Sequence, residues 1–182
     1  MKMTVKKIAA VSVWGVYTAA FLFIAYLLEY GPVKIIRYCI LSAAIFYLAY
    51  LDIKSRIVPN RILLVLLAIR LFLLIPETVL YPDYLSVFIT SSVFGAVAAM
   101  LLLIIGNLIA KKGMGYGDIK LFGVIGFYVG MQSVLGILFF SLVFAAVYCI
   151  VLLIRKKISA RDEIPFVPFV FAGFAAASLL GV

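Results

Sequence analysis

The chain has 182 residues, of which 68% are hydrophobic and only 13% are charged. A mean hydropathy of +1.30 and a charged fraction far below the roughly 25% of soluble domains exclude an ordinary soluble globular protein. The net charge of +9 does not indicate nucleic-acid binding, because the basic residues form short clusters between apolar runs. We therefore expect an all-α, polytopic membrane helix bundle that forms a single domain over residues 1–182.

Apolar segments in chain order predict about seven membrane spans. They cover residues 8–28, 33–51, 61–75, 85–110, 119–131, 133–154 and 165–182. With the N-terminus in the cytosol, only Lys34, Arg37 and Arg70 of the 16 Lys and Arg residues fall toward the outside. The positive-inside rule therefore favours a cytosolic N-terminus.

Acids and prolines mark the predicted outer loops, as expected for polar turns. These residues are Glu29, Glu77 and Asp83 with Pro32, Pro76 and Pro82. Arg70 is the one basic residue well inside a predicted span, and we expect it to snorkel or to pack against other helices.

Two aspartates border the apolar segments on the cytosolic side. Asp52 ends the second segment and Asp118 begins the fifth, in a chain with only seven acidic residues. A carboxylate beside hydrocarbon is expensive, and a carboxylate pair can activate water without a metal. The chain has no histidine, and Cys39 and Cys149 lie far apart, so we expect no metal site and no cofactor.

The fifth segment is short for a membrane span. Residues 119–131 make roughly 20 Å of helix, whereas the hydrocarbon core is about 30 Å thick. If the outer end of this helix reaches the outer boundary, Asp118 begins below the cytosolic surface. The sequence therefore predicts a water-accessible pocket with Asp118 at its floor.

Glycines alternate ahead of this aspartate. Gly113, Gly115 and Gly117 allow positive φ and a close approach of another backbone, so an extended substrate strand could lie beside Asp118. The alternative is a flexible turn in which Asp118 is an ordinary helix N-cap.

Other polar and turn residues flank the two aspartates. Pro59 and Asn60 predict a turn and a new helix, with Asn60 as its cap. We expect Lys120 to orient the helix or to contact lipid headgroups. Pro165 and Pro168 are tolerated at the start of the last helix, and alternatively they form a wall of the pocket.

In these motifs the chain resembles the type IV prepilin peptidases, membrane aspartic peptidases of the Gly-x-Gly-Asp class. The resemblance rests on Asp52 with residues 58–60, on residues 113–121 and on residues 165–169. It covers the chain from about residue 40 to the end. Val58 and Val167 depart from it mildly, since isoleucine and glycine are expected there.

The resemblance implies that Asp52 and Asp118 are the catalytic pair. It implies that pilin-like precursors are the substrates, cleaved after a short basic leader at the cytosolic face of the cytoplasmic (inner) membrane. Larger members carry a cysteine-rich cytosolic domain between their first two spans, but here residues 29–32 alone separate those spans, on the outer side. We expect a compact member that acts as a peptidase without N-methyltransferase activity.

The expected chemistry is attack of water on a peptide carbonyl, with one carboxylate ionised and the other protonated. Asp118 begins a helix and Asp52 ends one, so the helix dipoles favour Asp118 as the base and Asp52 as the proton carrier. Two alternatives remain: an ion- or proton-coupled small transporter that uses both aspartates as a relay, and a related peptidase that acts on other leader segments. The oligomeric state is left open.

Overall fold

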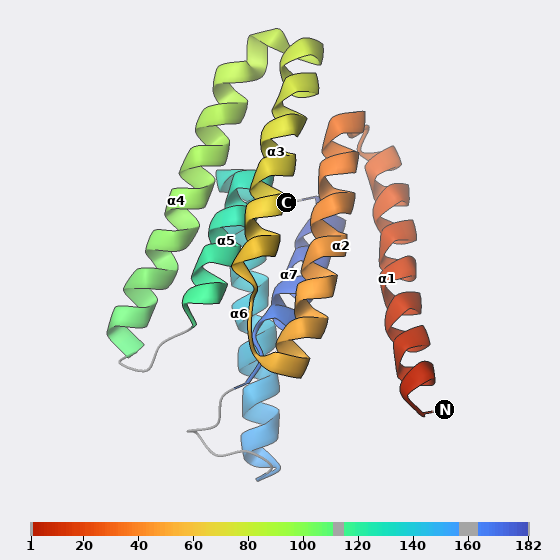
Figure 1. The fold of residues 1–182 in the computed structure, drawn as a ribbon, viewed down its shortest axis with the longest axis vertical. Coiled ribbons are helices and arrows are strands. Elements are labelled where there is room, and N and C mark those ends of the chain that lie inside the picture. Colours follow the sequence, from red (N-terminus) through yellow and green to blue (C-terminus); the bar gives the residue numbers. More distant parts are fainter. Residues whose placement is uncertain (1, 111–114, 157–163, 182) are drawn as a thin grey trace.

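The computed structural model describes residues 2–110, 115–156 and 164–181, which are almost entirely helical (Figure 1). The elements in chain order are α1 (Lys2–Leu27), α2 (Pro32–Ser55), α3 (Asn60–Leu80), the 3-10 turn η1 (Pro82–Tyr84), α4 (Leu85–Ala110), α5 (Tyr116–Val129), α6 (Met131–Ile154) and α7 (Val167–Leu179). The described residues contain no strand. The prediction of an all-α bundle with seven helical segments is confirmed.

Four of the helical stretches are long and apolar enough to cross a membrane. They are Pro32–Ser55, Asn60–Leu80, Pro82–Ile109 and Met131–Ile154. Large apolar side chains cover the exterior of the bundle, and Phe23, Phe72, Phe94 and Phe139 are all more than 60% exposed. Such a surface is unfavourable in water and favourable against lipid. The fold is that of a helical membrane bundle.

One boundary differs from the prediction in a way that matters. α3 continues through Pro76 to Leu80, five residues beyond the expected end. Proline is tolerated in membrane helices because neighbouring helices and polar side chains satisfy the freed backbone groups. Glu77 therefore does not lie in an outer loop, as the sequence suggested, but is buried inside α3 with 4% exposure.

α5 is the short, mostly buried helix of the bundle, and it packs closely against α4. A Cβ on Gly126 would collide with the backbone of Gly95, and a Cβ on Gly95 would lie 2.6 Å from the carbonyl carbon of Gly130. Gly130 has a φ of 86° and turns the chain from α5 into α6. Contact between glycine surfaces allows two helices to approach this closely.

The outer end of α5 stops short of the turn between α3 and α4 (Figure 1). Gly95 lies ten residues inside α4, which begins at Leu85, and this corresponds to roughly 15 Å along the helix. α5 therefore ends alongside the middle of α4 and not beside the turn between α3 and α4. The length of α5 alone does not set the depth of Asp118.

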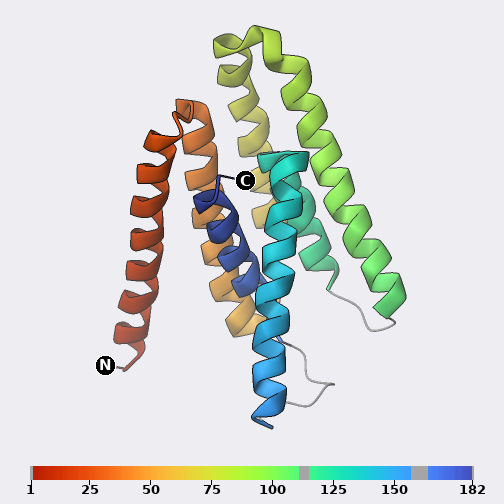
Figure 2. The ribbon, with the colours of Figure 1, turned by 180° about the vertical axis from the view of Figure 1, so that it is seen from behind.

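α7 lies among α1, α2 and α6 (Figure 2). An aromatic cluster of Tyr17, Phe21, Tyr38 and Phe174 joins α1, α2 and α7. The hydroxyl groups of Tyr17 and Ser178 are hydrogen-bonded at 3.0 Å within this cluster. This packing directs the first residue of α7 toward the end of α2.

Candidate active site

Asp52 lies in the last turn of α2 and is 6% exposed. The helix ends three residues later, where Arg56 adopts a left-handed conformation and donates its backbone N–H to the carbonyl oxygen of Asp52. The side chain faces α7: its Oδ2 accepts a hydrogen bond of 3.0 Å from the backbone N–H of Val167. Val167 is the first residue of α7, so this N–H has no partner within its own helix.

The start of α7 therefore places positive partial charge at a buried carboxylate. Phe166 precedes the helix without making a side-chain cap, and Pro168 in the first turn has no N–H to offer. Asp52 takes the place of the missing cap from another helix. A carboxylate at a helix N-terminus is stabilised by the exposed N–H group and by the helix dipole.

Asp118 lies in the first turn of α5 and is partly buried. Its backbone N–H donates to the carbonyl oxygen of Gly115 at 3.0 Å. Gly115 is the N-cap of α5, and no side chain caps this helix start. Asp118 is therefore the third residue of the helix and not its N-cap. The alternative reading of Asp118 as an ordinary capping residue is wrong.

Of the glycines before Asp118, Gly117 packs closely against another segment of the chain. Gly115 has a φ of −59°, and Gly117 is not among the described residues with positive φ. A Cβ on Gly117 would lie 3.1 Å from the Cβ of Val58 in the loop between α2 and α3. The approach of a substrate strand to these glycines stays a prediction, whereas positive φ at Gly115 and Gly117 was a wrong expectation. Gly113 lies outside the described residues.

Three segments that are distant in the sequence meet at this place. The loop after Asp52 contacts the start of α5 through Val58, and the ring of Phe122 in α5 lies 6.1 Å from that of Phe166 before α7. The ends concerned lie toward the same part of the bundle in both views (Figures 1 and 2). The described residues of the three sequence motifs therefore lie close together.

The flanking residues have structural partners. Asn60 is the first residue of α3, where Pro59 is the N-cap, so Asn60 is not the expected cap. Its Oδ1 instead accepts a hydrogen bond of 3.4 Å from Nζ of Lys120 in α5. Pro165 lies before α7 and Pro168 in its first turn, as expected for a helix start.

The two carboxylates interact electrostatically. Asp118 stands one residue before the apolar segment 119–131 and outside the four long membrane helices. Burial, and after it the nearby charge of Asp52, together raise the pKa of Asp118 to about 6. Loss of solvent and a like charge both disfavour ionisation, and here they outweigh the favourable dipole of α5.

The described residues contain no group of three or more His, Cys, Asp or Glu side chains that could hold a metal ion. A cavity of about 400 Å³ lies between α2 and α3, lined by apolar residues and Arg61. Neither Asp52 nor Asp118 lines it. The predicted pocket with Asp118 at its floor stays a prediction.

Sequence reasoning missed the backbone N–H of Val167 as a partner of Asp52. Proline at the second position of the last helix was the available signal, because it marks a helix start whose free N–H groups need acceptors. It also missed a buried ion cluster around Arg70. No local sequence pattern predicts that cluster, because its members come from α2, α3, α4 and α5.

The fold and the site together define a helical membrane protein with two interacting carboxylates at the ends of its helices. A sequence profile described as the Type IV leader peptidase family matches residues 39–150. The chain belongs to this family.

Curated relatives agree with the family match. The chain is 34% identical over 133 residues to a prepilin leader peptidase/N-methyltransferase of Bacillus subtilis (strain 168), covering 73% of this chain and 51% of that protein. It is 31% identical over 136 residues to the protein of that name from Aeromonas salmonicida (strain A449), covering 71% and 44%. The corresponding protein of Burkholderia pseudomallei (strain 1026b) is 27% identical over 146 residues, covering 78% and 45%. The chain spans about half the length of these relatives, and no solved structure matches it.

Proposed function

We propose that this protein is a membrane aspartic endopeptidase that removes the short basic leader of pilin-like precursors. The observation that carries the proposal is the electrostatic interaction of Asp52 with Asp118 within the segment that matches the leader peptidase family. The relatives named prepilin leader peptidase/N-methyltransferase support the substrate class.

The contacts support the opposite assignment of base and proton donor to the one that the helix dipoles of Asp52 and Asp118 suggest. Asp52 receives the N–H of Val167, which stabilises its anion. Burial and the charge of Asp52 raise the pKa of Asp118 to about 6, so this carboxyl group keeps its proton to a higher pH than an ordinary aspartate does. Asp52 is therefore the base and Asp118 the proton donor in the mechanism that we propose.

In this mechanism Asp52 takes a proton from water while the water oxygen attacks the peptide carbonyl carbon. Asp118 gives its proton to the carbonyl oxygen, so the tetrahedral intermediate is neutral. When the C–N bond breaks, Asp52 passes its proton to the leaving nitrogen, and Asp118 recovers its own as the carbonyl re-forms. Gly115 is exposed and lacks a Cβ, which leaves room for a substrate backbone beside Asp118.

The site faces the cytosol of the cytoplasmic (inner) membrane in this proposal. Three basic residues support this orientation: Lys54 in the last turn of α2, Arg56 directly after that helix, and Arg61 in the first turn of α3. No described contact favours the alternative of an ion- or proton-coupled transporter.

Incubation of the purified protein in detergent with a pilin-like precursor tests the proposal. Asp52→Asn and Asp118→Asn should each abolish leader removal while the protein stays helical and membrane-inserted. Asp83→Asn is the matched control, because Asp83 is exposed in η1 at the turn between α3 and α4, and it should cleave as the parent does. Near-normal turnover by either variant refutes the proposal that both carboxylates are needed for catalysis.

A further inference from the structure

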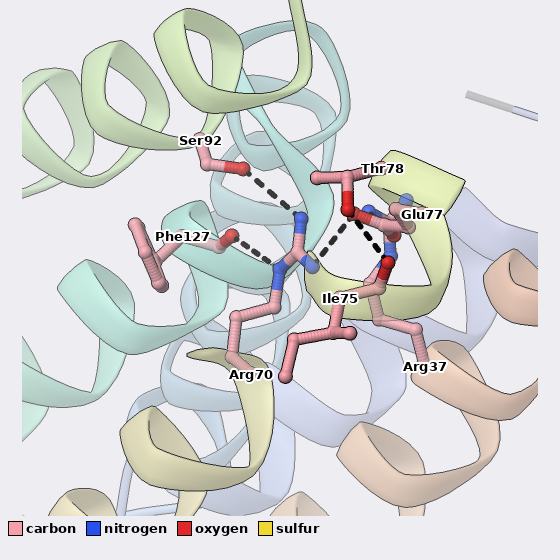
Figure 3. Close-up of polar contacts among 7 residues, drawn as sticks. All are labelled: Arg37, Arg70, Ile75, Glu77, Thr78, Ser92 and Phe127. Carbon is pink, nitrogen blue, oxygen red and sulfur yellow. Dashed lines mark hydrogen bonds and ion pairs between the residues drawn. The ribbon is translucent and has the colours of Figure 1, made fainter. Parts of the chain in front are cut away.

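A buried arginine joins three helices of the bundle. Arg70 in α3 is completely buried, and each nitrogen of its guanidinium group donates a hydrogen bond (Figure 3). Nη1 donates to Oε2 of Glu77 at 2.9 Å, Nη2 to Oγ of Ser92 in α4 at 3.3 Å, and Nε to the carbonyl oxygen of Phe127 in α5 at 3.2 Å. Arg70 therefore packs in the interior and does not snorkel.

The contact with Phe127 supports a helix end that lies inside the bundle. Phe127 is in the last turn of α5, where carbonyl groups lack intrahelical donors. The N–H of Met131, which would continue the helical pattern to Phe127, donates to Oγ of Ser91 at 3.3 Å instead. A cation at a helix C-terminus also meets the negative end of the dipole. Arg70 thus caps α5.

A second polar contact holds the same turn. The hydroxyl group of Tyr128 donates to the carbonyl oxygen of Leu66 at 2.7 Å, one turn before Arg70 in α3. The last turn of α5 is therefore anchored to α3 at two points. Asp118 stands on the first turn of the same helix, nine residues from Phe127, which is roughly 14 Å away along the axis.

We propose that Arg70 is a positioning residue for the carboxylate pair. Its guanidinium group holds the C-terminal turn of α5 against α3 and α4, and the stiff helix carries this constraint to Asp118. The place of Asp118 relative to Asp52 then depends on a contact at the far end of α5. The proposal rests on the proposed function for its kinetic test.

Arg37 provides a matched comparison. Its Nη1 donates to Oε1 of Glu77 at 3.0 Å, so it contributes to the same buried cluster from α2. Arg37→Gln and Arg70→Gln each remove one guanidinium group and leave Glu77 with one arginine. Among the described contacts, Arg70 donates a hydrogen bond to α5, whereas Arg37 does not. A general loss of cluster stability should affect both variants, whereas loss of positioning should follow Arg70.

The kinetic experiment compares Arg70→Gln, Arg70→Lys and Arg37→Gln in precursor cleavage. We expect both Arg70 variants to lower kcat about 10- to 100-fold, with KM within threefold, because a misplacement near 1 Å costs up to about 100-fold in rate. Lysine keeps the charge but cannot reproduce three fixed donors, so Arg70→Lys should not rescue kcat. Arg37→Gln should keep kcat within twofold. An unchanged kcat in the Arg70 variants, or equal losses at Arg37 and Arg70, overturns the proposal.

A distance measurement tests positioning without proteolysis. Spin labels on Lys54→Cys and Tyr116→Cys, in a Cys39→Ala and Cys149→Ala background, report on the end of α2 and the start of α5, and both labelled positions are exposed. Arg70→Gln should shift or broaden the distance distribution, and Arg37→Gln should leave it unchanged. An unaltered distribution in Arg70→Gln overturns the proposal. Failure of the parent protein to cleave the precursor counts against the proposed function alone, because this measurement still reports on positioning.

Discussion

Gly126→Ala tests whether the close contact of α4 and α5 supports the site. The added methyl group would meet backbone atoms of Gly95 and, at 2.8 Å, the backbone nitrogen of Ala96. Backbone cannot yield as a flexible side chain can, so we take the upper part of the range of about 1–3 kcal/mol for overpacking. Alanine regains up to about 1 kcal/mol of helix propensity. The net loss is then about 2 kcal/mol.

For a chain of this size, a loss of this magnitude lowers the apparent melting temperature by about 4–8 °C. Thermal unfolding in detergent, followed by circular dichroism, measures it, and cleavage of a precursor should fall because α5 carries Asp118. Gly106→Ala in α4 is the control, since a Cβ there meets nothing within 4 Å, and it should melt at or above the parent temperature. A melting temperature of Gly126→Ala within 1 °C of the parent would refute the packing argument.

Two further predictions concern the carboxylate pair and the core. The pKa of Asp118 is raised from 3.8 to about 6, so its stability contribution is complete below pH 3.8 and is lost as pH rises through about 6. Cleavage should likewise fall above pH 6 as the proton donor ionises, and melting curves of Asp118→Asn should lose the pH dependence of this interval; a persisting slope assigns it to another group. Tyr17→Phe removes the buried hydrogen bond to Ser178 and should lower stability by about 1 kcal/mol, while Tyr26→Phe, 80% exposed, should melt as the parent does.

The helices and the motif residues were predictable because their signals are local. Apolar segments of membrane length identify helices wherever they occur, and Asp52, Asp118 and Pro168 stand at helix ends that their neighbours in sequence define. The predicted helix boundaries were wrong where packing against a neighbouring helix overrides the local sequence preference. α3 runs through Pro76, and Glu77 is consequently buried against Arg37 and Arg70.

The surroundings of the two aspartates were not predictable from their own helices. Each helix dipole alone favours Asp118 as the anion. The tertiary structure adds the N–H of Val167 at Asp52 and buries Asp118 beside a like charge. These influences act through space over a few ångströms, and our proposal that Asp52 is the base and Asp118 the proton donor rests on them.

The sequence by itself determined the class of fold, the family and the two carboxylates, because composition, span length and short motifs are properties of contiguous residues. Only the tertiary structure decided that Arg70 caps α5, that α5 ends inside the bundle, and that the start of α7 faces Asp52. Each of these contacts joins residues separated by tens of positions or more. Helix packing brings such residues together, and no local pattern in the chain encodes that packing.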